Sequence, residues 1–509
     1  MPTNFLILMA DQLSAGALST YGGSALTPNI DSLARQGVVF DSFYCNSPLC
    51  APSRFSFLAG QLPSKIGAYD NAAEFPAQTP TFAHYLRRAG YQTALSGKMH
   101  FCGPDQLHGF EERLTTDIYP ADFGWTPDWT RFEERPAWYH TMDSVTQAAP
   151  CVRTNQIDYD DEVVYAARQK LFDMARARDP RPFCLVVSMT HPHDPYAIAQ
   201  PYWDRYQDRK IAMPTLSGSA VPEDPHSRRL RHVIGLEQHT PTDGQVLAAR
   251  RAYLGSVSYV DDQVGTLLGV LQDTRLADNT IVMLLADHGD MLGERGLWYK
   301  MNFFEPACRI PLIVSAPGRF AARRIPHHAS LLDVLPTLVE LGSEGRATDY
   351  AMLPEGRSLA GHLTGAAAHT GEAEHEVIGE YLAEGAIAPI VMIRRGRYKF
   401  VHCPVDPDQL YDLEADPLER RNLAGSVEQA DTVATFRDEV SKRWSLSAVH
   451  EQVLASQSRR RLVDSALRIG RHVSWDFQPV RDASRVYVRN DQELNDTEAS
   501  ARFPPAPDR

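Results

Sequence analysis

Apolar runs that alternate with helical segments constrain the fold of this chain more than any other feature. The runs lie at 4–11, 91–96, 183–188, 279–286 and 309–315. Most of them lack the polar alternation of a half-exposed strand and are typical of strands buried on both faces of a parallel sheet. Segments with helical spacing separate them, at 29–37, 81–90, 160–176, 243–271 and 331–341. The sequence therefore predicts an α/β fold, in which a large mixed, mostly parallel sheet is sandwiched by helices.

The character of the chain changes near residue 370. Two short strand-like runs, 390–393 and 398–401, flank an Arg-Gly turn and predict a hairpin, and a helix is expected over 430–446. The last part holds a basic helix at 448–469 and a proline-rich end, with little core of its own. We expect three parts, with boundaries at 1–368 (α/β domain), 369–447 (α+β subdomain) and 448–509 (extension). Such an extension wraps its own subunit or docks on a neighbour. In the second case the protein is a homo-oligomer, a dimer or tetramer.

Composition narrows the compartment and the partners. The formal net charge of −13 predicts an acidic surface and argues against nucleic acid as a partner. The N-terminal apolar run is too short to cross a bilayer, and no longer run follows, so no membrane partner is expected. The seven cysteines are odd in number and lack paired spacing, which favours a reducing cytoplasm over a disulfide framework.

The stretch Cys50-Ala51-Pro52-Ser53-Arg54 precedes an apolar, helix-like run. Pro52 is suited to the first turn of a helix, which would place Cys50 at the helix N-terminus, where free N–H groups favour an anion. Cys50 is then well placed to act as a nucleophile or a metal ligand. The alternative is a small buried cysteine before an ordinary helix.

Polar residues follow the strands at the same predicted edge of the sheet. Asp11 and the pair Asp287-His288 come directly after two of the runs. Together with Cys50 they could hold one divalent cation, and oxygen-rich coordination suits Ca²⁺ or Mg²⁺, with Mn²⁺ compatible with the imidazole. Taken singly, each of these residues is as well explained as a cap, a turn former or a satisfied polar group.

Cations and aromatic rings surround this predicted site. Arg54, Lys98, His100, His191 and Lys300 would suit a tetrahedral anion. Aromatic side chains are concentrated in 125–140, within a long insertion over 101–160 that we expect to be ordered. Such rings can hold a quaternary ammonium group, or they can simply pack the insertion.

Taken together, these motifs resemble the sulfatase family of the alkaline-phosphatase-like superfamily. The Cys50-x-Pro52-Ser53-Arg54 core resembles the signature that a maturation enzyme reads when it oxidises the cysteine to formylglycine. Gly97-Lys98-x-His100 and Asp287-His288-Gly289-Asp290 match in the same order. Longer runs, at 105–110, 119–128 and 190–196, are most similar to the choline sulfatases.

The resemblance implies a role for each matching residue. Cys50, as formylglycine, would be nucleophile and metal ligand, and Asp11, Asp287 and His288 would complete a Ca²⁺ site. Gln12 stands where many sulfatases have a second aspartate. The catalytic set would also contain Arg54, Lys98, His100, His191 and Lys300, with His100 handling the proton of the hydrated aldehyde. The implied cycle is attack of a diol oxygen on sulfur, departure of the alcohol, and collapse of the sulfated hemiacetal.

The same resemblance implies a pocket for choline. Substrate-binding residues would be Asn71, Trp125, His140, His193, Glu384 and Asn495. Asn71 would contact the sulfate, whereas Trp125, His140 and Glu384 would face the trimethylammonium group. Asn495 lies where the subgroup's tail carries an acidic residue into a neighbouring subunit, which is a departure from the pattern.

We therefore expect a cytoplasmic hydrolase that cleaves choline-O-sulfate to choline and sulfate. Three alternatives stay open at this point. A phosphonate monoester or phosphodiester hydrolase could use the same metal and aldehyde. A non-catalytic choline-ester binding protein would not need the full set of polar residues, and a cysteine hydrolase would use a Cys50 thiolate with His100 as its base.

Overall fold

The computed structural model describes residues 3–177, 179–217, 221–346, 348–366, 376–480, 498–499 and 502–504. Its main sheet has nine strands, with β1 (Asn4–Asp11) near the centre. The order is β11 (Arg323–Ser330), β2 (Val38–Tyr44), β10 (Leu312–Ser315), β8 (Thr280–Ala286), β1, β6 (Phe183–Pro192), β3 (Gln92–Gly97) and β4 (Glu112–Arg113), with β9 (Arg309–Ile310) paired to β2. Strand β1 runs parallel to both β6 and β8, whereas β10 is antiparallel to both of its neighbours.

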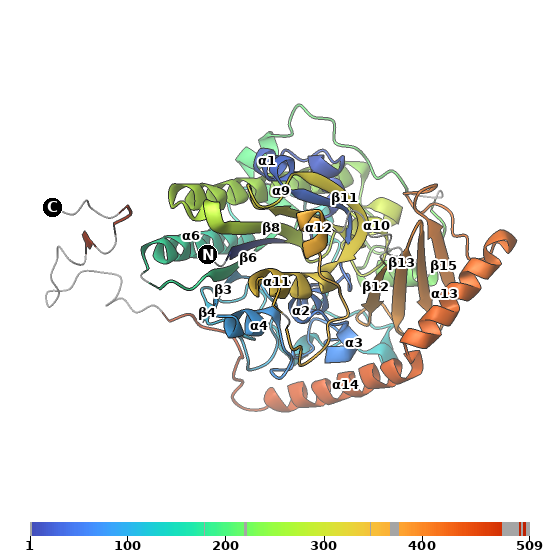
Figure 1. Ribbon diagram of the computed structural model, residues 1–509. Coiled ribbons are helices and arrows are strands. Elements are labelled where there is room, and N and C mark those ends of the chain that lie inside the picture. Colours follow the sequence, from blue (N-terminus) through green and yellow to red (C-terminus); the bar gives the residue numbers. More distant parts are fainter. Residues whose placement is uncertain are drawn as a thin grey trace.

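Helices cover both faces of this sheet (Figure 1). One face carries α1 (Pro28–Gln36), α6 (Asn155–Arg176) and α9 (Asp243–Asp273). The other carries α2 (Cys50–Ala59), α4 (Phe82–Arg88), α11 (Val334–Gly342) and α12 (Ala360–Thr364). Every residue of β1, β6 and β8 is buried, which explains why these strands read as continuous apolar runs. The predicted mixed, mostly parallel α/β sandwich is confirmed.

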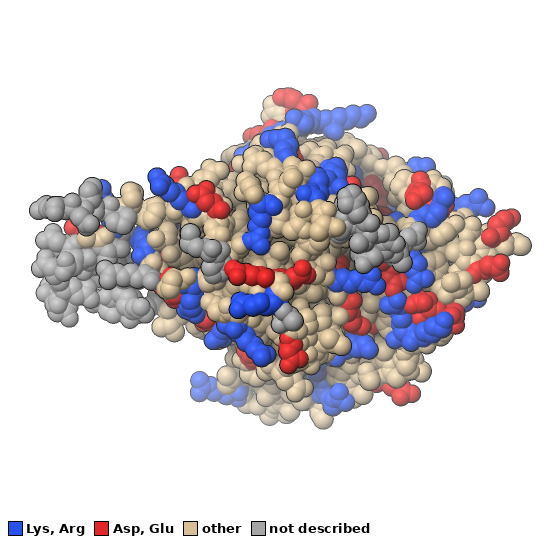
Figure 2. All heavy atoms as spheres, in the orientation of Figure 1, with Lys and Arg blue, Asp and Glu red and all other residues tan. Residues whose placement is uncertain are grey.

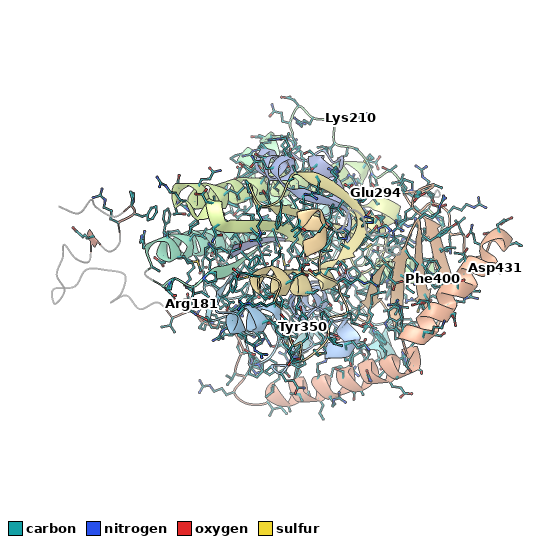
Figure 3. All side chains as sticks on the ribbon, in the orientation of Figure 1. Arg181, Lys210, Glu294, Tyr350, Phe400 and Asp431 are labelled. Atoms are coloured by element: carbon teal, nitrogen blue, oxygen red, sulfur yellow. The ribbon has the colours of Figure 1, made fainter. Side chains whose placement is uncertain are left out.

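A second, antiparallel sheet follows near the C-terminus. Its strands, in order, are β12 (Glu376–Tyr381), β13 (Ile390–Arg395), β14 (Tyr398–Cys403) and β15 (Asp406–Asp412). Helix α13 (Ala430–Arg443) packs on it, and Phe400 of β14 stacks on Phe436 with ring centroids 5.3 Å apart (Figure 3). The long helix α14 (Leu446–Leu467) then runs back beneath the main domain (Figure 1). The predicted boundary at 368/369 lies outside the described residues.

Several elements differ from the sequence expectation. Strand β11 was not predicted, because its Arg-Arg-Ile-Pro-His-His sequence is polar and it forms the edge of the sheet beside β2. Helix α8 (Pro225–Val233) lies inside a segment without a clear sequence period. Within 101–160 the chain forms short elements, including α5 (Asp143–Thr146) and β5 (Ala149–Cys151), the latter paired with β7 (Ala197–Ala199).

The described surface carries charges of both signs. On the face shown in Figure 2, lysine and arginine side chains are interspersed with aspartate and glutamate. No helix among the described residues is long and apolar enough to span a bilayer. The seven cysteines all fall within described segments, and all are unpaired thiols.

Candidate active site

The carboxyl ends of the parallel strands bring the predicted site residues to one edge of the main sheet. Asp11 is the last residue of β1, Asp287 follows β8, and Lys98 follows β3. Helix α2 begins at Cys50, so the sulfur stands at a helix N-terminus, as the position of Pro52 in its first turn indicated. Open α/β sheets place ligand chemistry at this edge.

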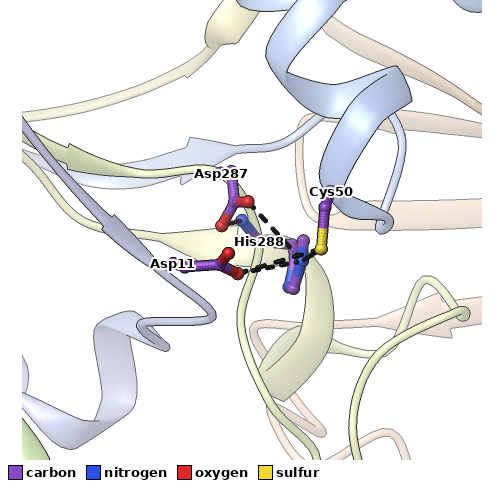
Figure 4. A group of neighbouring side chains, drawn as sticks. All are labelled: Asp11, Cys50, Asp287 and His288. Atoms are coloured by element: carbon purple, nitrogen blue, oxygen red, sulfur yellow. Dashed lines mark hydrogen bonds and ion pairs between the residues drawn. The ribbon is translucent and has the colours of Figure 1, made fainter. Parts of the chain in front are cut away.

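Asp11, Cys50, Asp287 and His288 form one buried cluster (Figure 4). One ligand atom from each lies within 4.8 Å of all the others. The Cys50 sulfur is 3.3 Å from Nε2 of His288 and 3.9 Å from Oδ1 of Asp11. Nε2 of His288 is 3.6 Å from Asp11 and 3.7 Å from Asp287. The four side chains therefore converge on one point, although they come from three separate elements.

Local hydrogen bonds fix the orientation of Asp287. Its Oδ1 accepts from the backbone N–H groups of Gln12 (3.0 Å) and His288 (2.8 Å). The Ser53 hydroxyl donates to the Asp287 carbonyl at 2.5 Å. Oδ2 of Asp287 therefore faces the cluster, and it accepts a hydrogen bond from Arg54 Nε at 2.9 Å. The serine and the arginine of the Cys50 motif thus both secure a neighbouring ligand.

Arg54 and Lys98 neutralise the carboxylates of the cluster. Arg54 Nη2 lies 3.2 Å from Asp11, and Arg54 Nη1 donates to the Lys98 carbonyl at 2.7 Å and to Ser188 Oγ at 2.8 Å. Lys98 Nζ contacts Asp11 Oδ2 and lies 3.6 Å from the Cys50 sulfur. Burial opposes charge on Asp11, but Lys98 and Arg54 are among the neighbours that hold its pKa well below the ordinary value.

The environment of Cys50 favours an anion at this position. Burial alone would raise the pKa of the thiol, but Lys300, Lys98 and His288 outweigh it and hold the pKa well below its usual value. The neighbouring His100 side chain contributes to the same lowering of the thiol pKa. The other buried cysteines, such as Cys45 and Cys184, show the opposite effect, because burial raises the pKa of their thiols.

The side chain of Gln12 bonds to Lys300 and Asp290. Its side-chain oxygen accepts from Lys300 Nζ at 2.7 Å, and its Nε2 donates to Asp290 Oδ2 at 2.6 Å. Lys300 Nζ also lies 2.8 Å from Nε2 of His193. Gln12 thereby holds the ammonium group of Lys300 beside the cluster, and its own backbone adopts a positive φ of 66°.

Two predicted histidines have buried ring nitrogens that bond to none of the described residues. They are both nitrogens of His100 and Nε2 of His191. Asp117 accepts from the His100 backbone N–H at 2.8 Å, and Asp160 accepts from Nδ1 of His191 at 2.7 Å. Neither carboxylate could be selected from the sequence, because each lies in a different segment of the chain from the histidine that it contacts.

Glu384 and Trp125 were both predicted to face the substrate. Glu384 is buried, and neither of its carboxylate oxygens accepts a hydrogen bond from any described residue. Burial raises its pKa from 4.5 to about 8. The ring of Trp125 lies 5.8 Å from that of His100, centroid to centroid. Trp129 and Glu384 line a cavity of about 220 Å³.

Other predicted substrate residues occupy defined positions. Nδ1 of His140 lies 3.1 Å from Asp194, and the His140 ring stacks on Tyr299 with centroids 4.5 Å apart. Asn71 accepts from the Ala51 backbone N–H at 2.9 Å, beside Cys50. Asn495 lies outside the described residues. A larger cavity, of about 510 Å³, lies beyond Asp290, but none of the predicted site residues lines it.

Helix α14 secures the pocket wall from outside. Its Arg460 forms two 2.7 Å bonds to the buried Asp70, the residue before Asn71, and a 3.2 Å bond to Thr126. Gln457 of the same helix accepts from the Trp129 backbone N–H at 3.0 Å. Sequence periodicity gave no signal for these contacts, since the bonded residues are separated by more than three hundred positions.

A buried cluster of possible metal ligands thus lies at the carboxyl edge of a mixed sheet, and the chain belongs to the alkaline-phosphatase-like class of hydrolases. Residues 3–343 match the family described as Sulfatase, and residues 451–503 match the description "Choline sulfatase enzyme C terminal". A choline-sulfatase of Rhizobium meliloti (strain 1021) is 48% identical over 512 residues, covering 98% of each chain. The chain therefore belongs to the sulfatase family, and it is a sulfuric ester hydrolase.

A more distant relative is also a sulfatase, and a solved structure shares the fold. An uncharacterized sulfatase of Escherichia coli (strain K12) is 27% identical over 446 residues, covering 86% of each chain. Among solved structures, a phosphonate monoester hydrolase from Silicibacter pomeroyi has a TM-score of 0.68 at 23% identity and covers 86% of this chain and 94% of its own. At that identity the structural likeness supports the fold alone.

Proposed function

We propose that this protein hydrolyses choline-O-sulfate to choline and sulfate at the carboxyl edge of its main sheet. The observation that carries the proposal is Glu384, a buried carboxylate without a hydrogen-bond partner among the described residues, in a cavity that Trp129 also lines. The choline-sulfatase of Rhizobium meliloti, 48% identical along nearly the whole chain, supports the same substrate.

A quaternary ammonium ion explains why Glu384 is left without a partner. Burying a carboxylate without hydrogen bonds is costly, so such a group is retained where a ligand completes its environment. A trimethylammonium group has no N–H to donate and is held by aromatic faces and by negative charge. Trp125 and His140 supply rings, and Glu384 supplies the charge. Binding of the cation favours the ionised carboxylate, which burial disfavours in the free protein.

The sulfate end is proposed to bind among the cations of the cluster. Lys98, Lys300 and Arg54 place positive charge around Cys50, where the ester sulfur would lie. Asn71 and His191 would add polar contacts, and His193 supports Lys300 from its far side. Fixed cations of this kind stabilise the negative charge that develops on the sulfate oxygens as the ester bond breaks.

The donor set fits a divalent cation. Asp11 and Asp287 offer buried carboxylate oxygens, and His288 offers an imidazole nitrogen within the same 4.8 Å cluster as position 50. Hard oxygen donors favour Ca²⁺, and Mg²⁺ or Mn²⁺ is also compatible with them. A bound metal ion would supply Lewis acidity to the sulfate group. Arg54 and Lys98 balance the remaining negative charge.

Cys50 is proposed to be converted to formylglycine by a maturation enzyme. When hydrated, formylglycine supplies an oxygen nucleophile for attack on sulfur. The pocket suits an anionic oxygen at position 50, because the same cations already lower the pKa of the thiol there. His100, beside this position, would hold and return a proton. A cysteine hydrolase would need only the Cys50 thiolate and His100 as its base, and not the metal ligands.

Two further expectations belong to the same proposal. We propose a cytoplasmic protein, in keeping with seven unpaired cysteines. We also propose a homo-oligomer, a dimer or tetramer, which is supported by exposed apolar side chains in the last turns of α14 and just beyond it, among them Leu462 (71% exposed) and Ile469 (82% exposed).

The proposal is tested by comparing substrates on the purified, matured protein. We expect kcat/KM for choline sulfate to exceed the values for 4-nitrophenyl sulfate and for a phenyl phosphonate monoester. Preference for the phosphonate ester would favour the alternative hydrolase, and tight binding of choline sulfate without turnover would favour the binding protein. The mass of the peptide that contains residue 50 tests the nucleophile separately, because an intact thiol in fully active protein would overturn the formylglycine proposal.

A further inference from the structure

The cavity of about 510 Å³ beyond Asp290 lies between the main domain and the second sheet. The main domain contributes lining residues such as Tyr44 of β2 and Leu254 of α9, and the second sheet contributes Arg394 of β13. Cavities of this size, where two structural units meet, are common ligand sites. None of the predicted site residues lines this one, so a ligand here would not occupy the proposed catalytic site.

Two buried arginines line this cavity without a carboxylate beside them. Arg295 is 3% exposed and Arg394 is 5% exposed, and neither lies at ion-pair distance from a carboxylate among the described residues. Nη1 of Arg295 donates to the Glu419 carbonyl at 2.7 Å, and Nη1 of Arg394 donates to the Tyr398 carbonyl at 3.1 Å. These acceptors are neutral oxygens, so no carboxylate balances the two positive charges directly.

The acidic side chains of the cavity have partners of their own. The lining contains four arginines and four acids, namely Arg250, Arg295, Arg309, Arg394, Asp290, Glu294, Glu305 and Glu419. Nζ of Lys399, which does not line the cavity, lies 2.9 Å from Glu305 and 2.6 Å from Glu419. Asp290 accepts hydrogen bonds from Gln12 and Tyr196. With Lys399 included, five cations meet four acids, which leaves an excess of positive charge around the cavity.

Arg295 also keeps an unused hydrogen-bond donor. Its Nε is buried and bonds to none of the described residues. The rest of the residue is held firmly, because its backbone N–H donates to the Leu216 carbonyl at 2.6 Å and its guanidinium group lies 4.0 Å from the ring centroid of Phe304. Its backbone φ is 58°, a left-handed conformation that is uncommon for a long side chain. Strained backbone and an unsatisfied buried donor are both typical of positions that a ligand completes.

A cavity that only separates two packed units would not need these charges. A buried ion loses its hydration, so buried charges are normally paired or bind a ligand. An anionic ligand would supply the missing negative charge, because guanidinium groups bind carboxylate, sulfonate and phosphate groups through paired N–H donors. Apolar side chains, among them Leu254, Met291 and Leu418, form another part of the lining. The ligand should therefore combine a negative group with an apolar part.

We infer that this arginine-lined cavity is a second ligand site, which binds an organic anion. The negative group of the ligand meets the guanidinium groups, and its apolar part lies against side chains such as Leu254 and Met291. The volume suits an organic molecule rather than a bare inorganic ion. The inference does not rest on the proposed substrate, because none of the predicted site residues contributes to the cavity.

The experiment titrates the full-length protein with 8-anilinonaphthalene-1-sulfonate, an aromatic sulfonate that fluoresces in apolar sites and has no ester bond to hydrolyse. We expect one saturable site. Octanoate should displace the dye at a lower concentration than inorganic sulfate does, because only octanoate has an apolar part. A second titration uses Cys50→Ala, which is expected not to consume sulfate esters. Excess choline sulfate or phenyl sulfate should leave the dye bound there.

Substitutions in the lining locate the bound dye. Leu254→Trp fills the cavity from α9 and should abolish saturable binding. Arg295→Gln should weaken binding about tenfold, because a charge-assisted hydrogen bond is lost. Arg309→Gln, at a partly exposed position, should weaken it about threefold, and this variant keeps the test open if the buried substitutions do not fold. The matched control is Arg324→Gln, since Arg324 bonds to Asp41 on the surface and does not line the cavity. Its affinity for the dye should not change.

Every outcome bears on the inference. Displacement of the dye by the sulfate esters would place it in the catalytic site, and equal affinities in Arg309→Gln and Arg324→Gln would place it elsewhere on the surface; either result would overturn the inference. Inorganic sulfate as effective as octanoate would refute an organic ligand. A protein that binds the dye in the cavity but does not hydrolyse choline sulfate would support the inference and refute only the proposed function. Hydrolysis of choline sulfate without dye binding would refute the inference alone.

Discussion

Replacing Glu384 by glutamine tests the choline pocket most directly. The substitution keeps the size of the side chain and removes only the negative charge. Two unit charges about 4 Å apart interact by about 4 kcal/mol at the effective dielectric typical of protein sites. Removing the ammonium group from water offsets part of this energy. We therefore expect kcat/KM for choline sulfate to fall about 100-fold, because KM rises. An aryl sulfate lacks the cation and should lose less than about twofold by the same argument.

The pKa of Glu384 adds a pH signature to this prediction. Burial raises the pKa from 4.5 to about 8, and only the ionised form attracts the cation. In the native protein we therefore expect kcat/KM for choline sulfate to rise as the pH passes through about 8. Glu384→Gln should lack this rise, and aryl sulfate hydrolysis should lack it in both proteins. Equal losses on both substrates, at every pH, would refute the reasoning.

The same shift predicts that the substitution stabilises the fold. Between pH 4.5 and about 8 the folded protein keeps a proton on Glu384 that the unfolded chain has lost, so the free energy of unfolding falls with pH across this window. The full penalty, reached above about pH 8, is of the order of 5 kcal/mol at 1.36 kcal/mol per pH unit. Thermal denaturation should show Glu384→Gln more stable than the native protein at pH 9, with little difference at pH 4.5.

Three other substitutions probe the nucleophile, the metal ligands and α14. Cys50→Ala should abolish sulfate release, measured by a sulfate assay, and should leave the melting temperature within a few degrees of the native value, measured by calorimetry. Residual turnover above about 1% would contradict the role of position 50. Asp11→Asn should weaken binding of Ca²⁺ or Mn²⁺, measured by calorimetric titration of metal-free protein, and unchanged affinity would remove Asp11 from the ligand set. Arg460→Leu should cost about 3 kcal/mol in urea unfolding, because Asp70 would be left buried and unpaired, whereas the exposed Arg459→Leu should cost less than about 0.5 kcal/mol.

Much of the site could be predicted from local sequence. The apolar runs mark where β1 and β8 end, and parallel strands end at one edge of the sheet, so Asp11, Asp287 and His288 were expected to converge. The position of Pro52 indicated a helix start, and α2 begins at Cys50. These features were predictable because each depends on the order of residues within one element.

The partners of these residues could not be predicted in the same way. Asp160 reaches His191 from another element, and Gln12 binds Lys300 across 288 residues. The sequence marked Gln12 only as a departure from the family pattern, and its bond to Lys300 became visible when β1 and the segment after β8 were packed together. Strand β11 was missed for a related reason, since a polar edge strand carries no apolar period.

The amino-acid sequence by itself determined the α/β class, the edge of the sheet that carries the chemistry, and the residue types gathered there. The tertiary structure decided which buried charges have partners and which do not. Glu384, from the loop between β12 and β13, has no hydrogen-bond partner among the described residues, whereas Asp70, three hundred and ninety residues from Arg460, is paired with it. Periodicity reports which face of an element is buried, but the cost of a buried charge depends on what the rest of the fold places beside it.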